Sequence, residues 1–213
     1  MAPEDKLPGT FITVEGIDGC GKSTQARLLA DALECAGRDV LLLREPGGVR
    51  ISEKIRAILL DPENEAMGME CELLLYEAAR AQLVREVIAP ALAAGRVVVC
   101  DRFYDSTTAY QGYAGGLSLE AVRQANALAV GAFHPQLTLV FDIDPVIAAK
   151  RTASRAADRI EARGLAYQAR VAEGFRAIAA AEPERVKLID AARPVEAVAA
   201  DVRAAVEQAG VRF

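Results

Sequence analysis

The sequence predicts an α/β fold built on a doubly wound, parallel sheet of five strands. Five short apolar runs, at residues 10–15, 39–44, 96–100, 137–142 and 185–189, alternate with longer Ala- and Leu-rich stretches. The runs are continuously apolar rather than alternating, which is typical of parallel strands covered on both faces. Strands that alternate with helices predict right-handed crossovers and helices on both sides of the sheet.

The stretches between these runs carry apolar residues at the spacing of amphipathic helices. Gly37 is a candidate C-cap for the first of them, and Pro90 predicts a kink or break inside a long one. The 213 residues suffice for a single domain, and they show no repeat, linker or low-complexity tract. The predicted helices are residues 22–36, 51–60, 70–94, 119–133, 145–154, 162–181 and 195–209.

Composition narrows the classes of protein that the chain can represent. The formal net charge is −5, which argues against a broad basic surface for nucleic acid. Residues 1–8 lack the pattern of a secretory signal, and no apolar run approaches the length of a membrane span. The four cysteines form no zinc-binding spacing, and a single histidine, His134, weakens any catalytic triad. We therefore expect a cytoplasmic protein with reduced thiols that contacts neither membrane nor nucleic acid.

The first motif is a phosphate-binding loop directly after the apolar run at residues 10–15. The chain matches the pattern GxxxxGK[ST] in full, and a helical stretch follows, as this motif requires. The glycines let backbone N–H groups curve round phosphate oxygens, Lys22 supplies a full positive charge, and the Ser23 hydroxyl is a ligand for Mg²⁺. The predicted ATP-binding residues are Gly16, Ile17, Asp18, Gly19, Cys20, Gly21, Lys22, Ser23 and Thr24.

Cys20 lies inside this loop, beside a helix N-terminus and close to Lys22. Both neighbours favour the thiolate, so we expect a lowered thiol pKa and inactivation by alkylation that ATP prevents. The alternative is a small spacer residue that the loop shields from solvent.

A second motif is the carboxylate that follows the apolar run at residues 96–100. Asp101 stands where the acid of a Walker-B motif is expected, beside the phosphate-binding loop. There it would hold Mg²⁺ through a water molecule, while Arg102 would neutralise phosphate charge. The alternative is an ordinary strand end with a surface salt bridge. Asp142 and Asp144 end another strand, where capping of the next helix is their expected role.

A third feature is a basic stretch that interrupts the helical pattern at residues 150–163. A phosphoryl transition state spreads negative charge over three oxygens, so a mobile lid with arginines would supply the compensating charge when it closes. The alternative is a solvated helix face whose cations pair with Asp158 and Glu161. The basic residues are Lys150, Arg151, Arg155, Arg159 and Arg163.

Six short segments, in a fixed order along the chain, carry a family resemblance. They are Arg44-Glu45-Pro46-Gly47-Gly48, Leu74-Leu75-Tyr76-Glu77-Ala78-Ala79-Arg80, Asp101-Arg102-Phe103, Ser106-Thr107-Thr108-Ala109-Tyr110-Gln111-Gly112, Asp158-Arg159-Ile160-Glu161 and Leu188-Ile189-Asp190-Ala191. Together they closely resemble bacterial thymidylate kinases over about residues 10–205. The resemblance implies a P-loop kinase fold with a lid at about residues 150–163, transfer of the γ-phosphate of ATP to dTMP with Mg²⁺, and a homodimer.

The resemblance also implies roles for individual residues. Asp18 is similar to the acid that faces the 3′-hydroxyl, Tyr76 to the aromatic residue that stacks on thymine, and Arg80 to the donor to a thymine carbonyl. Tyr76 and Arg80 are one helical turn apart, so they share a helix face. Further implied dTMP contacts are Arg44, Arg56 and Arg102 around the phosphate, Thr107 and Gln111 at the base, and Tyr110 near C2′. The implied catalytic residues are Lys22, Asp101, Arg102, Arg155 and Arg151.

Three departures from the family pattern accompany the resemblance. Tyr76 stands where Phe is usual, Arg50 stands where Pro commonly follows the Arg-Glu-Pro-Gly-Gly segment, and the lid is short before Asp158. Two alternatives stay open. Another small kinase, acting on UMP or CMP, a deoxynucleoside or shikimate, would share the phosphate-binding loop. A regulatory ATP- or GTP-binding switch would need no acceptor, although the Asn-Lys-x-Asp guanine reader of GTPases is absent from the sequence.

Overall fold

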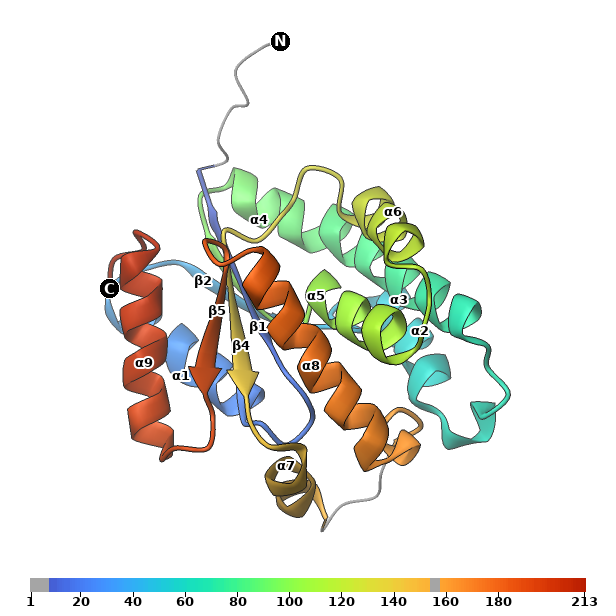
Figure 1. Ribbon diagram of the computed structural model, residues 1–213. Coiled ribbons are helices and arrows are strands. Elements are labelled where there is room, and N and C mark those ends of the chain that lie inside the picture. Colours follow the sequence, from blue (N-terminus) through green and yellow to red (C-terminus); the bar gives the residue numbers. More distant parts are fainter. Residues whose placement is uncertain (1–7, 154–157) are drawn as a thin grey trace.

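The computed structural model describes residues 8–153 and 158–213, and its centre is a five-stranded parallel sheet (Figure 1). The strands lie in the order β2-β3-β1-β4-β5. Their bounds are β1 Thr10–Glu15, β2 Val40–Arg44, β3 Val97–Asp101, β4 Leu137–Asp142 and β5 Val186–Asp190. The predicted α/β class and parallel sheet are confirmed, and the strand ends differ from the predicted ones by at most one residue.

Helices cover both faces of the sheet, as the doubly wound prediction requires. In β3, Val97 and Val99 belong to a core shared with α1 and α9, whereas Val98 and Cys100 belong to a second core shared with α4 and the end of α3. Successive side chains of a strand point to opposite faces, so one apolar run contributes to both cores. The helices are α1 Lys22–Cys35, α2 Arg50–Leu60, α3 Met69–Leu83, α4 Ala89–Ala93, α5 Tyr104–Thr107, α6 Leu119–Val130, α7 Pro145–Thr152, α8 Leu165–Ala181 and α9 Val195–Gln208.

The two edge strands are less covered than the sequence pattern predicts. Leu42 in β2 and Leu188 in β5 keep 40% and 47% of their surface exposed. The central strands β1, β3 and β4 are buried along almost their whole length. A strand with a neighbour on one side receives less cover from the helices above and below, so an apolar run predicts a strand but not its place in the sheet.

The long helix predicted at residues 70–94 is interrupted just before Pro90, as expected. The regular helix α3 ends at Leu83, a π-helical turn spans Val84–Ile88, and α4 follows with Pro90 in its first turn. Proline lacks a backbone N–H and its ring crowds the carbonyl group four residues earlier, so regular α-helical bonding is disrupted there. A second π-helical segment, at Thr108–Ala114, was not predicted.

The carboxyl ends of β1, β2 and β3 lie together at one edge of the sheet. In the parallel register Val14 lies beside Asp101, and Asp101 lies beside Arg44. In the strand order, the chain passes from β1 across β3 to β2, and from β3 across β1 to β4, so these two connections run in opposite directions. Open α/β sheets bind their ligands at such a point, so the fold directs attention to the ends of these strands.

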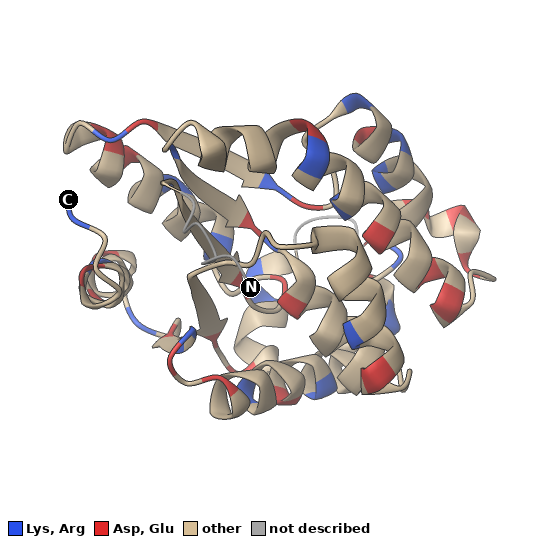
Figure 2. Ribbon diagram, turned by 90° about the horizontal axis from the view of Figure 1, so that it is seen from above, with Lys and Arg blue, Asp and Glu red and all other residues tan. Residues whose placement is uncertain are grey.

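Charged residues of both signs are interspersed over the helices when the molecule is seen from above (Figure 2). Over the residues that the structure describes, no helix is both long and apolar enough to cross a membrane. The expectation that the protein binds no nucleic acid stays a prediction.

Candidate active site

A cavity of about 250 Å³ lies at the carboxyl ends of β1, β2 and β3. Its wall is formed by the phosphate-binding loop, the ends of these strands, α2, α3, the second π-helical segment and the chain just after residue 157. Every position predicted to contact dTMP, except Arg80, lies in this wall. The lining residues are Asp18, Lys22, Ser23, Arg44, Glu45, Pro46, Arg56, Leu60, Tyr76, Asp101, Arg102, Ser106, Thr107, Tyr110, Gln111, Asp158, Ile160 and Glu161.

The phosphate-binding loop joins β1 to α1, which begins at Lys22. Gly19 has a φ of 82°, and a Cβ there would lie 2.3 Å from the carbonyl oxygen of Ala148, so this position requires glycine. No side chain caps the N-terminus of α1, which leaves its first backbone N–H groups available to a phosphate. Nζ of Lys22 lies 3.3 Å from Oδ1 of Asp18, so the cation is already held beside this anion site.

Ser23 and Asp101 form the part of the site that fits Mg²⁺. The hydroxyl of Ser23 donates a hydrogen bond to Oδ2 of Asp101. The other carboxylate oxygen of Asp101 is buried and has no hydrogen-bond partner among the described residues. A hydroxyl and a carboxylate are the hard oxygen donors that Mg²⁺ prefers, with phosphate and water oxygens completing its octahedron. The donor set therefore suits the predicted roles of Ser23 as a ligand and Asp101 as a contact through water.

Arg102 follows β3 and reaches back to the phosphate-binding loop. Its φ of 73° lies in the left-handed region, which costs a non-glycine residue on the order of 1–3 kcal/mol. Nη1 donates to the carbonyl oxygen of Gly16 at 2.9 Å, and Nη2 donates to Oδ1 of Asp18 at 2.7 Å. Burial opposes ionisation of Asp18, but the charges of Arg102 and Lys22 outweigh it and hold the pKa of this carboxyl well below its usual range.

Two more arginines line the same cavity, and we call Arg44, Arg56 and Arg102 the arginine group. Nη1 of Arg44 and Nη1 of Arg56 each donate to the carbonyl oxygen of Pro46 at 2.9 Å, and Arg44 also pairs with Glu53 at 2.9 Å. Burial and the nearby charge of Arg44 lower the pKa of Arg56, as expected where cations are crowded. A bound phosphate would relieve this crowding, because arginine forms strong charge-assisted hydrogen bonds with phosphate oxygens.

Aromatic and polar side chains line another part of the cavity wall and suit a planar base. Tyr76 is half-buried, and Thr107 and Gln111 are buried. The hydroxyl of Thr107 accepts a hydrogen bond from Arg80 at 2.9 Å, so its own proton is available to a ligand. The ring of Tyr110 packs 5.1 Å from the guanidinium carbon of Arg102, which joins the base side of the cavity to its phosphate side.

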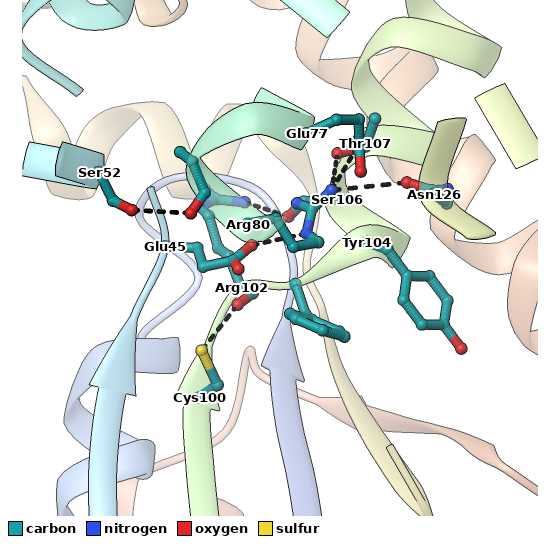
Figure 3. Close-up of polar contacts among 12 residues, drawn as sticks. Glu45, Ser52, Glu77, Arg80, Cys100, Arg102, Tyr104, Ser106, Thr107 and Asn126 are labelled. Atoms are coloured by element: carbon teal, nitrogen blue, oxygen red, sulfur yellow. Dashed lines mark hydrogen bonds and ion pairs between the residues drawn. The ribbon is translucent and has the colours of Figure 1, made fainter. Parts of the chain in front are cut away.

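Arg80 lies behind the cavity wall and is not one of its lining residues. Its spacing of one helical turn from Tyr76 had suggested that it contacts the base directly. It is 2% exposed and lies between two acidic residues (Figure 3). Nε donates to Glu45 at 2.8 Å, and Nη1 donates to Glu77 and, at 2.9 Å, to Thr107. Nη2 forms no hydrogen bond within the described part of the chain, so it is the donor left for a base carbonyl. Contact between Arg80 and thymine stays a prediction, with Thr107 as the visible link to the cavity.

Cys20 is not the reactive thiol that its position in the loop suggested. Its surface is 2% exposed, and a Cβ built on Gly16 would lie 2.9 Å from its Sγ. Burial raises the pKa of the thiol and outweighs the nearby charge of Lys22, so the predicted lowering of this pKa is wrong. Desolvation disfavours the thiolate more than one cation favours it, which supports the alternative of a shielded spacer.

The two arginines predicted to be catalytic in the lid are not part of the described cavity wall. Arg151, on α7, donates to the carbonyl oxygen of Ala191 at 3.3 Å and to that of Gly19 at 3.5 Å. It therefore lies against the phosphate-binding loop from outside the cavity. Arg155 lies outside the described residues. The catalytic roles of Arg151 and Arg155 stay predictions.

Two other basic residues of this stretch, Arg159 and Arg163, do not lie on a solvated helix face, which was the alternative to a lid with arginines. Arg159 and Arg163 both pair with the fully buried Glu72, with nitrogen–oxygen distances of 2.5 and 2.6 Å. Asp158 instead accepts hydrogen bonds from the backbone N–H groups of the residues two and three positions later, and it lines the cavity with Glu161. The end of the predicted lid is thus anchored on α3.

Buried acidic residues are the part of the site that the sequence analysis missed. Glu45 and Glu77 flank Arg80, and Glu72 contacts Gln111. The spacing held a signal, because positions 72, 76 and 80 recur every four residues and share one face of a helix. Acidic residues on a helix face are usually solvated, so the spacing alone does not reveal that this face is buried.

The fold and the cavity together define a class of protein, a P-loop phosphotransferase with a site for a phosphate-bearing acceptor. The phosphate-binding loop and the Ser23–Asp101 pair would hold the nucleotide and its metal ion, and the arginine group faces the same cavity. An acceptor phosphate bound by these arginines would lie beside the donor phosphates, as direct transfer requires.

Comparison with known proteins identifies the particular family. The family model described as thymidylate kinase matches residues 14–202. The thymidylate kinase of Symbiobacterium thermophilum is 49% identical over 93% of this chain and 92% of that protein, and that of Exiguobacterium sibiricum is 48% identical over 90% and 91%. The crystal structure of thymidylate kinase from Ehrlichia chaffeensis superimposes with a TM-score of 0.77 at 34% identity, covering 93% of this chain and 98% of the other. The chain belongs to the thymidylate kinase family.

Proposed function

We propose that the protein transfers the γ-phosphate of ATP to dTMP and releases dTDP and ADP, a step towards dTTP. The observation that carries this proposal is a single cavity that combines the phosphate-binding loop, the arginine group and a polar, aromatic wall. The names of its relatives, thymidylate kinases that align over almost their whole length, support dTMP as the acceptor.

In the proposed reaction an oxygen of the dTMP phosphate attacks the γ-phosphorus of ATP, and the bond to the bridging oxygen of ADP breaks. Lys22 neutralises charge on the β- and γ-phosphates, and the arginine group holds the acceptor phosphate in line. Ser23 and Asp101 would hold Mg²⁺, which, when bound with ATP, neutralises and orients the phosphates. Because the phosphate-binding loop contains no arginine, we assign Arg155, with Arg151 as the second candidate, to the charge of the transferring group.

The deoxynucleoside is bound by the rest of the wall. Asp18 is held as a carboxylate by Arg102 and Lys22, so it suits a hydrogen bond from the 3′-hydroxyl. Tyr76 stacks on the base, and Tyr110 crowds the 2′ position so that deoxyribose is preferred. These assignments follow the resemblance, and the presence of all three acceptor-side residues in one cavity supports them.

We further propose that the whole chain acts as one P-loop kinase domain, with a lid at about residues 150–163, and that two copies form a homodimer. On α3 and α6, which pack against each other, Leu74 and Leu128 keep 64% and 89% of their surface exposed. Such apolar exposure suits a subunit interface. Light scattering of the parent and of Leu128→Asp tests this: a dimer that the substitution weakens is expected, and a monomeric parent contradicts it.

We propose a cytoplasmic location, because the four free thiols suit a reducing compartment.

The deciding experiment measures ADP release by purified protein with ATP, Mg²⁺ and each of dTMP, dUMP, dCMP, dAMP, dGMP and UMP. We expect the highest kcat/KM with dTMP and loss of the reaction without Mg²⁺. Turnover of UMP or dAMP without turnover of dTMP would identify another nucleoside monophosphate kinase. ATP hydrolysis at the same rate with and without any acceptor would favour a regulatory nucleotide switch.

A further inference from the structure

The orientation of one side-chain amide in the cavity wall is fixed by a buried acid. Gln111 is 2% exposed and lines the cavity, and its Nε2 donates a hydrogen bond to Oε1 of Glu72 at 2.7 Å. A carboxylate can accept hydrogen bonds from the amide but cannot donate to it. The amide nitrogen therefore faces Glu72, and Oε1 of Gln111, which has no protein partner among the described residues, is left for a molecule in the cavity.

Glu72 is itself held by two cations from the end of the predicted lid. Its exposed fraction is 0%, and Oε2 accepts a hydrogen bond from Arg163 at 2.6 Å and forms an ion pair with Nη2 of Arg159 at 2.5 Å. A second bond from Arg163 reaches Oε1 at 3.2 Å, so this contact is bidentate. Arg159 is in turn fixed by a 2.7 Å bond from Nε to the carbonyl oxygen of Leu59. Two guanidinium groups thus lock the carboxylate in one rotamer, because bidentate pairs specify geometry as well as energy.

We propose that Glu72 is a positioning residue for base specificity: it holds Gln111 so that Oε1 accepts a hydrogen bond from the N3–H group of thymine. This inference rests on the proposed function and deepens it. Thymine carries a proton on N3, whereas cytosine presents a lone pair there. An acceptor fixed at this point pairs with thymine and faces another acceptor in cytosine. Arg159 and Arg163 act through Glu72, which links base recognition to the chain that follows residue 157.

Glu72→Gln is the direct test, because it exchanges one oxygen for an amide nitrogen of nearly the same size. Two short guanidinium contacts converge on the Oε2 position, so the remaining oxygen belongs there and the new nitrogen faces Gln111. Gln111 then turns its own oxygen towards residue 72 and its nitrogen towards the cavity. We expect the ratio of kcat/KM for dTMP to that for dCMP to fall about 10- to 100-fold, mainly through KM, because an unpaired polar contact carries that penalty.

Controls separate positioning from a merely structural role. Glu70→Gln makes the same substitution at an exposed position on the same helix and should leave the ratio unchanged. In a double-mutant cycle, Glu72→Gln should have no further effect on the ratio once Gln111 is replaced by leucine. A structural role predicts the opposite, namely equal losses for dTMP and dCMP and the same loss with either residue at position 111.

A charge exchange keeps the proposal testable if Glu72→Gln does not fold. The double variant Glu72→Gln/Gln111→Glu retains one carboxylate in the cluster and presents an oxygen to the cavity in either rotamer. It should recover at least about tenfold of the lost preference for dTMP. Binding of dTMP and dCMP measured by calorimetry without ATP gives a readout that does not depend on turnover. A parent that binds dTMP tightly and variants that keep its dTMP/dCMP ratio would overturn the role of Glu72 while the proposed function stands; a parent that neither binds nor phosphorylates dTMP would overturn both.

Discussion

Replacing Arg80 by leucine should destabilise the folded protein before it reveals anything about base choice. Arg80 is the cation between two buried acids, Glu45 at 5% and Glu77 at 6% exposure. One oxygen of each acid is already buried without a hydrogen-bond partner among the described residues. Leucine fills part of the space but leaves both carboxyl groups without their counter-ion. Removing one partner of a buried ion pair costs about 3–5 kcal/mol, which is a large share of the stability of a typical domain.

The pH dependence of this loss follows from the pKa of Glu45. Burial raises that pKa from 4.5 to about 7, although the charge of Arg80 opposes the shift. A carboxyl group whose folded-state pKa is raised contributes stability that is present at low pH and is lost as the pH rises through the folded-state value. Without Arg80 the pKa of Glu45 rises further. The cost of Arg80→Leu should therefore be smallest near pH 5, where Glu45 is largely protonated in the folded state, and should grow towards pH 8.

Urea denaturation at pH 5, 6.5 and 8 measures this prediction. We expect Arg80→Leu to lower the free energy of unfolding by about 3 kcal/mol or more at pH 8 and by clearly less at pH 5. Arg80→Lys keeps the charge and should retain most of the stability at pH 8. A loss below about 1 kcal/mol, or one that is the same at all three pH values, would show that Arg80 does not compensate these acids.

Three further predictions concern the metal, the thiols and the lid. Asp101→Asn should raise the Mg²⁺ concentration for half-maximal rate by about 10- to 100-fold in a metal titration, and an unchanged titration contradicts the metal role. Iodoacetamide should label the exposed Cys35 and Cys71 before the buried Cys20, as peptide mass spectrometry can show; early labelling of Cys20 would mean that the loop opens. Arg155→Ala should lower kcat by about 10²-fold or more with little change in KM for dTMP, and a near-normal kcat would move this role to another cation.

The sequence predicts the fold well because its signals are local. A continuous apolar run marks each strand, and a GxxxxGK[ST] loop after the first run places β1 and α1. Motif order then identifies the cavity wall, including Arg44, Tyr76 and Gln111, without any knowledge of the strand order. The exposure of the edge strands could not be predicted in this way, because Leu42 and Leu188 lie in apolar runs like those of the central strands. Their exposure is decided by which strands are neighbours.

The parts of the site that escape prediction depend on burial and on long-range contacts. Glu45 and Arg80 are 35 positions apart, and Glu72 and Gln111 are 39 positions apart, so no spacing rule connects them. The prediction of a lowered thiol pKa for Cys20 is wrong for a related reason. Its local neighbours favour the thiolate, but the packing of the loop against the sheet removes the thiol from water and raises its pKa instead.

Paired acids hold the arginines of the cavity wall in place, in a protein whose net charge is −5. Arg44 pairs with Glu53 and Arg102 pairs with Asp18, so each carboxylate offsets part of the attraction that its arginine offers. In exchange, each guanidinium is held in one orientation before the ligand arrives. Ordering a flexible side chain on binding costs about 0.5–1.5 kcal/mol, and fixed donors avoid much of that cost. Recognition at this site therefore depends on where the cations are held rather than on how many there are.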